Sequence, residues 1–158
     1  MRKNIIDFSN FGSVKNTFEE IIYTQIPVVK DMGIELSGFN GTEIKLKAPL
    51  DKNINHRFSA FGGSIYSVAV LAVYGLVFLN LRKRNLNPHI VVHKSNVVYK
   101  APILQDFEAV CKIEKDKEFD DFIQYYIENK KSRIELSSNV IIDGQIAFTL
   151  NAKFVIYD

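Results

Sequence analysis

The sequence contains a single cysteine, Cys111, among its 158 residues, which excludes a disulfide within the chain. One free thiol fits a reducing compartment, and we expect a cytoplasmic protein. The first twelve residues, MRKNIIDFSNFG, lack the continuous apolar stretch and the small-residue cleavage site of a secretory signal. Cys111 alternates with Phe107, Ala109 and Ile113, and this spacing predicts a buried side chain.

The sequence also has little excess of one sign of charge, with 20 lysine and arginine residues against 18 aspartate and glutamate residues. The net charge of +2 is too small to indicate the strongly basic face of a nucleic-acid-binding protein. With 158 residues, 47% hydrophobic and 24% charged, the chain fits one globular domain with a sizeable core. We expect one domain over residues 1–158, with residues 1–25 forming an N-terminal extension and helix.

No aspartate or glutamate occurs between Asp51 and Asp106. This gap contains a long apolar run, from Ser64 to Leu81. A helix over that run is hydrophobic nearly all round and must be buried. Its length approaches that of a membrane span, but serines and glycines dilute it and strand-like patterns flank it, so we expect no membrane span.

The predicted helix has two different sides. Small residues on one side allow close approach of a neighbour, and large residues on the other fill a core. The small side comprises Ser64, Ala72 and Gly75, and the large side comprises Tyr66, Val70, Val73 and Val77.

The flanking sequence predicts strands and shorter helices. A first helix has Ser13 as its N-cap and ends at Pro27, a helical turn follows to Met32, and a later amphipathic helix covers 119–127. Alternating apolar residues predict strands at 34–36, 44–48, 89–101, 107–114, 134–142 and 146–156. Asn40-Gly41 and Asp143-Gly144 are hairpin turn signals. These patterns predict an α+β fold in which an antiparallel sheet of five or six strands wraps the long helix.

Short motifs resemble the hotdog superfamily of acyl-CoA and acyl-carrier-protein thioesterases and dehydratases. The residues that carry this likeness are Asn55, His56, Phe58, Phe61, Gly62, Gly63 and Ser64, followed by Tyr99-Lys100-Ala101-Pro102 and Asp106. From about Ile26 onward the chain is similar to the thioesterase domain of YiiD C-terminal type. That similarity lies in Met32-Gly33, Ala48-Pro49-Leu50, Asn53-Ile54-Asn55-His56, Phe61-Gly62-Gly63-Ser64 and Asp143-Gly144. The resemblance implies a hotdog fold and a homodimer or a dimer of dimers.

Thioester hydrolysis needs a polarised carbonyl, and the bare amides at a helix N-terminus supply one by stabilising the oxyanion. Gly62 and Gly63 let a carbonyl oxygen approach the amides of Gly63 or Ser64. Alternatively, the two glycines only let the start of the helix pack tightly against a neighbouring chain. Ser64 and Ser67 lie one turn apart and line the expected cleft.

The loop before the predicted helix supplies the other candidates. The resemblance implies that Asn55 positions the water or the carbonyl. His56 is a base or a hydrogen-bonding partner of the backbone, and Asn53 contacts substrate or caps the loop. Phe58 and Phe61 are expected to contact substrate.

The chain also departs from the thioesterase pattern. Phe61 stands where a histidine precedes Gly-Gly, Phe58 replaces a glycine, and Val70 falls where the helix carries an acid. The candidate functions are therefore an acyl-CoA or acyl-carrier-protein thioesterase, a non-catalytic acyl-thioester or fatty-acyl binding domain, and a dehydratase or hydratase, which the missing acid disfavours.

We expect no metal, and no cofactor beyond the CoA or phosphopantetheine of the substrate. The expected partner is an acyl thioester, free or on a carrier protein. The basic residues Arg82, Lys83, Arg84, Lys94 and Lys100 either meet phosphates or an acidic carrier protein, or are simply solvated.

Overall fold

The structure, a computed structural model, describes residues 5–158. Four helices and six strands follow one another in an order that matches the sequence-based prediction. They are α1 (Phe11–Gln25), α2 (Pro27–Asp31), β1 (Glu35–Phe39), β2 (Glu43–Ala48), α3 (Gly62–Lys83), β3 (His89–Tyr99), β4 (Phe107–Lys112), α4 (Asp116–Asn129), β5 (Lys131–Ile142) and β6 (Gln145–Tyr157).

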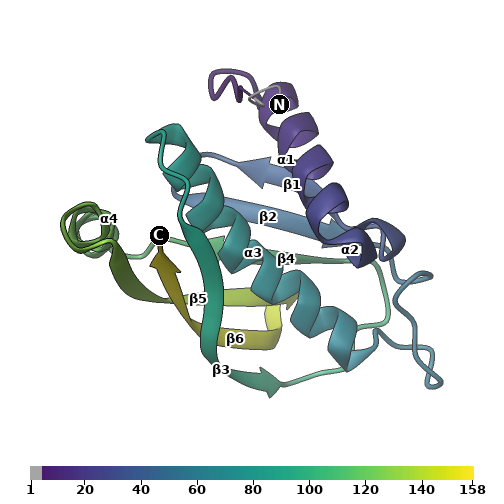
Figure 1. Ribbon diagram of the computed structural model, residues 1–158. Helices are drawn as coiled ribbons and strands as arrows, with labels where there is room; N and C mark the ends of the chain where they lie inside the picture. The colour runs from purple at the N-terminus through teal and green to yellow at the C-terminus, as the bar shows by residue number, and fades with distance from the viewer. Residues whose placement is uncertain (1–4) are drawn as a thin grey trace.

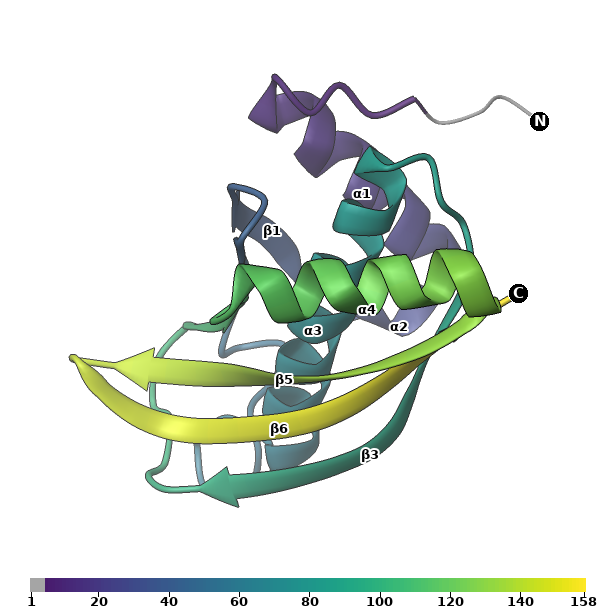
Figure 2. The same cartoon turned by 90° about the vertical axis from the view of Figure 1, so that its left-hand side faces the viewer.

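The six strands form one sheet in the order β1-β2-β4-β5-β6-β3, and all neighbours are antiparallel. The sheet curves around α3, and α1 lies beside α3 (Figure 1). Figure 2 shows α4 running along β5. The predicted α+β architecture, an antiparallel sheet wrapped around a long helix, is confirmed.

Helix α3 begins at Gly62, two residues before the expected start, and packs against β2, β4, β5, β6 and β3. It is the one helix among the described residues that is long and apolar enough to cross a membrane. However, 72% of its most apolar 18-residue window is buried within the protein. The sheet, and not lipid, therefore covers this helix.

The two sides of α3 match the prediction in part: the small side is approached closely, and half of the large side is buried. The small side packs inside the chain: a Cβ at Gly75 would lie 2.7 Å from Ile44 Cδ1 and 3.0 Å from Phe18 Cζ. On the large side Val73 and Val77 are buried as expected, but Tyr66 and Val70 are only half-buried. The close approach that the small residues permit is that of α1 and β2 to α3.

Most of the remaining local predictions are confirmed. The predicted apolar stripe of α1 is buried, namely Val14, Phe18, Ile21 and Ile22. Asp143 and Gly144 both have positive φ (50° and 77°), as the predicted two-residue hairpin requires. Cys111 is fully buried, and burial, with a contribution from Glu114, raises the pKa of its thiol to about 12.

Two local predictions were wrong. The N-cap of α1 is Asn10, whose Oδ1 accepts from the amide of Ser13 at 3.1 Å, because asparagine is as good a cap as serine and lies three residues earlier. In α4 the apolar stripe ends at Tyr126, and Ile127 is 43% exposed, because it turns away from β5.

The tight contact at Gly75 predicts that a larger residue there destabilises the fold. We expect Gly75→Val to lower the free energy of unfolding by about 2 kcal/mol, because the added methyl groups meet Ile44 and Phe18 in a packed core. Urea denaturation measures the change. Gln124→Val, which introduces the same residue at an exposed position of α4, is the control for placing valine in a helix. A Gly75→Val protein as stable as wild type would contradict this packing.

Candidate functional site

The N-terminal end of α3 leaves three backbone amides without a partner. Phe61, the N-cap, has extended φ and ψ of −64° and 131° and offers no side-chain acceptor. The first helical hydrogen bond runs from the amide of Ile65 to the carbonyl of Phe61 at 3.0 Å. Among the described residues, the N–H groups of Gly62, Gly63 and Ser64 therefore have no acceptor. With the helix dipole, they form a place where negative charge on an oxygen is stabilised.

Aromatic rings approach the two glycines closely. A Cβ at Gly63 would lie only 2.5 Å from Cε1 of Phe61, so the ring rests against the bare backbone. A Cβ at Gly62 would lie 3.4 Å from Cε1 of Tyr99. Both contacts lie within the chain and leave the amides free. Close packing of the glycine pair against a neighbouring chain stays a prediction.

Tyr99, at the end of β3, fixes this arrangement from the side of the sheet. Its hydroxyl donates to the carbonyl of Gly62 at 2.8 Å, and its ring meets Phe148 edge-on at 4.8 Å. Burial, and to a lesser extent Tyr66, raises the pKa of Tyr99. The sequence marks Tyr99 only as part of a strand-end motif, because its contact with Gly62 depends on the register of β3 against β6.

A cavity of about 310 Å³ opens at this end of the helix. Its lining is mostly apolar, with one cation and no carboxylate, and consists of Ala60, Gly62, Ile65, Tyr99, Lys100, Ala101, Pro102 and Ile103. A larger cavity, of about 640 Å³, lies elsewhere, between α4 and β5. By size alone the larger cavity would be the candidate site. The free amides and the apolar lining instead favour the smaller cavity as the place for thioester chemistry.

The two asparagines of the preceding loop are committed to holding it. The side-chain amide of the buried Asn53 donates to the carbonyls of Met32 (2.9 Å) and Pro49 (2.7 Å). Oδ1 of Asn55 accepts from the amides of Arg57 (2.8 Å) and Ser59 (3.2 Å). Both side chains therefore shape the loop that leads into α3.

The tip of this loop projects beside the N-terminal end of α3 (Figure 1). His56 is exposed there and makes no side-chain hydrogen bond with any described residue. Phe58 is 78% exposed and adopts a positive φ of 60°. The loop therefore carries its imidazole and its aromatic ring into solvent.

The structure gathers only part of the predicted site. Phe61, Gly62, Gly63, Ser64 and Ser67 share the first turns of α3, where Ser67 Oγ donates to the carbonyl of Gly63 at 2.8 Å and Ser64 is buried. Of all the predicted site residues, Gly62 alone lines the cavity. The roles of the others stay predictions.

The remaining candidate groups do not add an acid to this end of the helix. Val70, which stands where the thioesterase pattern has an acid, is half-buried. Asp106 lies on the neighbouring loop, where its Oδ1 accepts from the amide of Leu50 at 2.8 Å. Within residues 5–158 no group of three or more histidine, cysteine, aspartate or glutamate side chains gathers that could hold a metal ion.

An antiparallel sheet wrapped around one long helix is the architecture of the hotdog fold. Residues 15–158 match the family described as "Putative thioesterase (yiiD_Cterm)", and the chain belongs to this family.

Solved structures agree with that assignment. A protein of unknown function from Chlorobaculum tepidum TLS is 28% identical, with a TM-score of 0.89 over 93% of this chain and 96% of that one. A putative thioesterase from Shewanella oneidensis is 24% identical, with a TM-score of 0.84 over 93% and 99%. A thioesterase from Haemophilus influenzae is 14% identical, with a TM-score of 0.68 over 90% of each chain. The last two likenesses concern the fold.

Proposed function

We propose that the protein hydrolyses an acyl thioester of CoA or of a carrier protein. The observation that carries this proposal is the set of three unpartnered amides, Gly62 to Ser64, next to an apolar cavity. A thioester carbonyl that enters the cavity mouth accepts from these amides, most directly from Gly63 and Ser64. Preorganised donors stabilise the oxyanion that forms when water attacks.

The proposed reaction needs a base for the attacking water. The base takes a proton from water as the water oxygen adds to the carbonyl carbon and the carbonyl electrons move to oxygen. Collapse of this intermediate breaks the C–S bond, the departing sulfur takes the proton from the base, and a thiol and a carboxylic acid are released. We assign the base to His56, whose imidazole is exposed and free of other hydrogen bonds on the loop beside α3. Asn55 acts by holding that loop.

The cavity lining suits an acyl thioester. Ile65, Pro102 and Ile103 offer apolar surface to an acyl chain, and Phe58 and Phe61 offer exposed rings near its entrance. Lys100 is the cation of the lining and is placed to meet a phosphate of CoA or phosphopantetheine. Because the substrate brings its own CoA or phosphopantetheine, the proposed reaction needs no resident cofactor. We expect it to take place in the cytoplasm.

We further propose that the working unit is a homodimer, or a dimer of dimers, built through β3. Nine of the eleven residues of this edge strand are exposed, and its outer backbone groups are unpaired. Val91, Val92, Val97 and Val98 are among the exposed side chains. The half-buried Tyr66, Val70 and Tyr74 of α3 lie on the same flank. A twofold axis pairs two such edges antiparallel and covers this apolar surface.

The amide assignment predicts a difference between two substitutions of Gly63. Both Gly63→Ala and Gly63→Pro place a Cβ against Phe61, but only proline lacks the N–H, and the preceding Gly62 has no Cβ to meet the proline ring. We expect Gly63→Pro to hydrolyse acyl-CoA about 100-fold more slowly than Gly63→Ala, because one oxyanion donor is lost. The kcat values are measured on a panel of acyl-CoA chain lengths.

Equal rates for the two variants would remove Gly63 from the oxyanion site. The absence of a carboxylate from the cavity lining favours one alternative, a non-catalytic acyl-thioester binding domain. Tight binding of acyl-CoA by wild type, with no turnover on any chain length, would support that alternative. Turnover that His56→Ala leaves unchanged would reject the proposed base.

The dimer proposal predicts that a charge on the inner face of β3 separates the subunits. Val97 lies opposite the buried Leu150 and is 36% exposed, so Val97→Asp places a carboxylate in the proposed interface. We expect its dimer dissociation constant to rise at least about tenfold in sedimentation experiments. Asn96→Asp, one residue earlier on the outer face, is the control. A monomeric wild type at every concentration, or an unchanged Val97→Asp dimer, would contradict the interface.

A further inference from the structure

The first half of β5 has a neighbour on one side only. Strand β6 pairs with β5 over its whole length, but β4 pairs only Ala109–Cys111 with Ser138–Val140. The seven residues Lys131–Ser137 therefore present an unpaired strand edge in the middle of the sheet. No hydrogen bond from a side chain or loop of the described residues ends on the backbone of these seven residues.

A groove runs along this edge beneath α4. Its larger part, of about 640 Å³, is lined by five consecutive residues of β5, Lys131–Glu135, and by one face of α4, namely Glu118, Phe122, Tyr125 and Asn129. Consecutive strand residues point to opposite faces of a sheet, and no residue of β6 lines the cavity. The cavity must therefore lie at the edge of β5, beside its free backbone groups.

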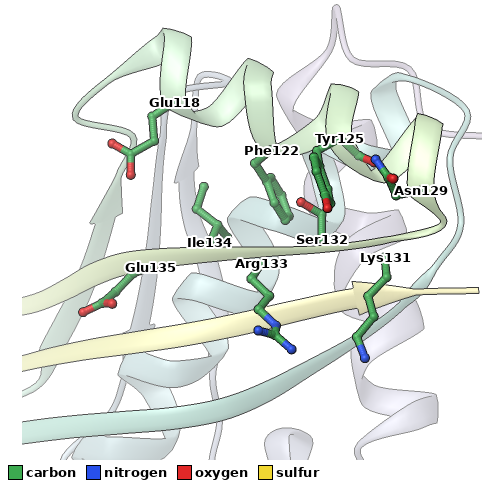
Figure 3. Close-up of a pocket in the computed structure, with 9 residues that line it drawn as sticks. All are labelled: Glu118, Phe122, Tyr125, Asn129, Lys131, Ser132, Arg133, Ile134 and Glu135. Carbon is green, nitrogen blue, oxygen red and sulfur yellow. The ribbon is translucent and has the colours of Figure 1, made fainter.

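Figure 3 shows Phe122 and Tyr125 directed from α4 toward β5, with Ser132 and Ile134 directed toward α4 from below. A second cavity, of about 180 Å³, continues the groove along Ile134–Ser137 to the end of β4 at Lys112–Lys115. The free edge is about 23 Å long at the usual rise of a strand. We call the two cavities together the α4–β5 groove.

The charges of the groove are arranged unevenly. Lys131 and Arg133 alternate with Ser132 and Ile134, are exposed, and form no ion pair with any described residue. Glu135, two residues further on, carries the opposite charge and is also exposed. A strand laid against this edge therefore meets two cations on its outer face. On its inner face it meets the exposed side chains of Glu118, Tyr125 and Asn129, because Phe122 and Ile134 are already buried.

We propose that the α4–β5 groove binds an extended peptide segment of another protein by strand addition. The backbone of the peptide pairs with Lys131–Ser137, its apolar side chains face the exposed ring of Tyr125, and its carboxylates face Lys131 and Arg133. Antiparallel pairing, as in the rest of the sheet, places a basic residue opposite Glu135. The favoured sequence thus alternates apolar residues with one basic and then two acidic residues.

A helix beside a free strand edge also has a protective role, because it keeps other chains from pairing there. Complete protection requires the helix to cover the backbone. The cavity along five consecutive residues leaves open space beside the edge, although α4 covers the side chains of Ser132 and Ile134. The site is also separate from the thioester cavity, since the two share no lining residue.

Fluorescence anisotropy with a labelled heptapeptide, Val-Lys-Val-Asp-Val-Asp-Val, tests the proposal directly. We expect saturable binding to the wild-type protein and roughly tenfold weaker binding of the charge-swapped peptide Val-Asp-Val-Lys-Val-Lys-Val. Two further peptides carry methyl groups on alternate backbone nitrogens, one on the odd-numbered and one on the even-numbered residues. Only every second N–H group of an added strand faces its neighbour, so one of these peptides should lose binding and the other should keep it. Amide resonances of Lys131–Ser137 should shift on binding.

Arg133→Glu should reduce the preference for the first peptide, because only two of its three charge pairs stay favourable. Lys30→Glu, the same charge change on α2, should leave the preference unchanged. Failure of the peptide to bind at about 1 mM, the weak end of specific affinities, would overturn the proposal. Equal binding of the two methylated peptides would overturn it as well. So would concentration-dependent protection of the Lys131–Ser137 amides without peptide, because a second copy of the chain would then occupy the edge.

Discussion

The helix α3 cannot be exposed to water, and the rest of the structure follows from that constraint. Fourteen of its 22 residues are buried, and each fully buried aliphatic side chain is worth about 1.5–3 kcal/mol. One face of a curved sheet covers the helix, and α1 closes the remaining side where Gly75 lets Phe18 approach. The ends of α3 then fall at the margins of the sheet. Its N-terminal amides lie next to the end of β3, because Tyr99 binds the carbonyl of Gly62 there.

Helices normally begin with a side chain that caps the first amides, and α3 has no such cap. Serine or aspartate at position 61 would accept from an amide of the first turn, typically adding about 1 kcal/mol of stability. Phenylalanine leaves the amides free and lays its ring on Gly63 instead. A helix end that lacks a stabilising cap and lies beside an apolar cavity is consistent with a site that receives the oxygen of a ligand. The same logic applies to the free edge of β5, where a shorter β4 leaves backbone groups unpaired.

Periodicity was enough to predict the elements, because each follows from local pattern. The stripe of α1, the Asp143-Gly144 turn and the apolar run of α3 depend on residues close together in the chain. The site could be predicted only in part. Gly62 and Gly63 were found because the motif is contiguous, whereas Tyr99 reaches Gly62 through the β3–β6 register. The hydrogen bond of Asn53 to the carbonyl of Met32, and the gap between β4 and β5, likewise depend on tertiary geometry that no spacing encodes.

The central claim is that the free amides at the start of α3 receive the carbonyl oxygen of a thioester. Its most direct test is the amide spectrum of the isotopically labelled protein, titrated with a ketone analogue of acyl-CoA in which a methylene group replaces the thioester sulfur. We expect the largest downfield amide proton shifts at Gly63 and Ser64, because each gains an acceptor that it lacks in the free protein. Saturable binding that leaves these two resonances in place would contradict the account.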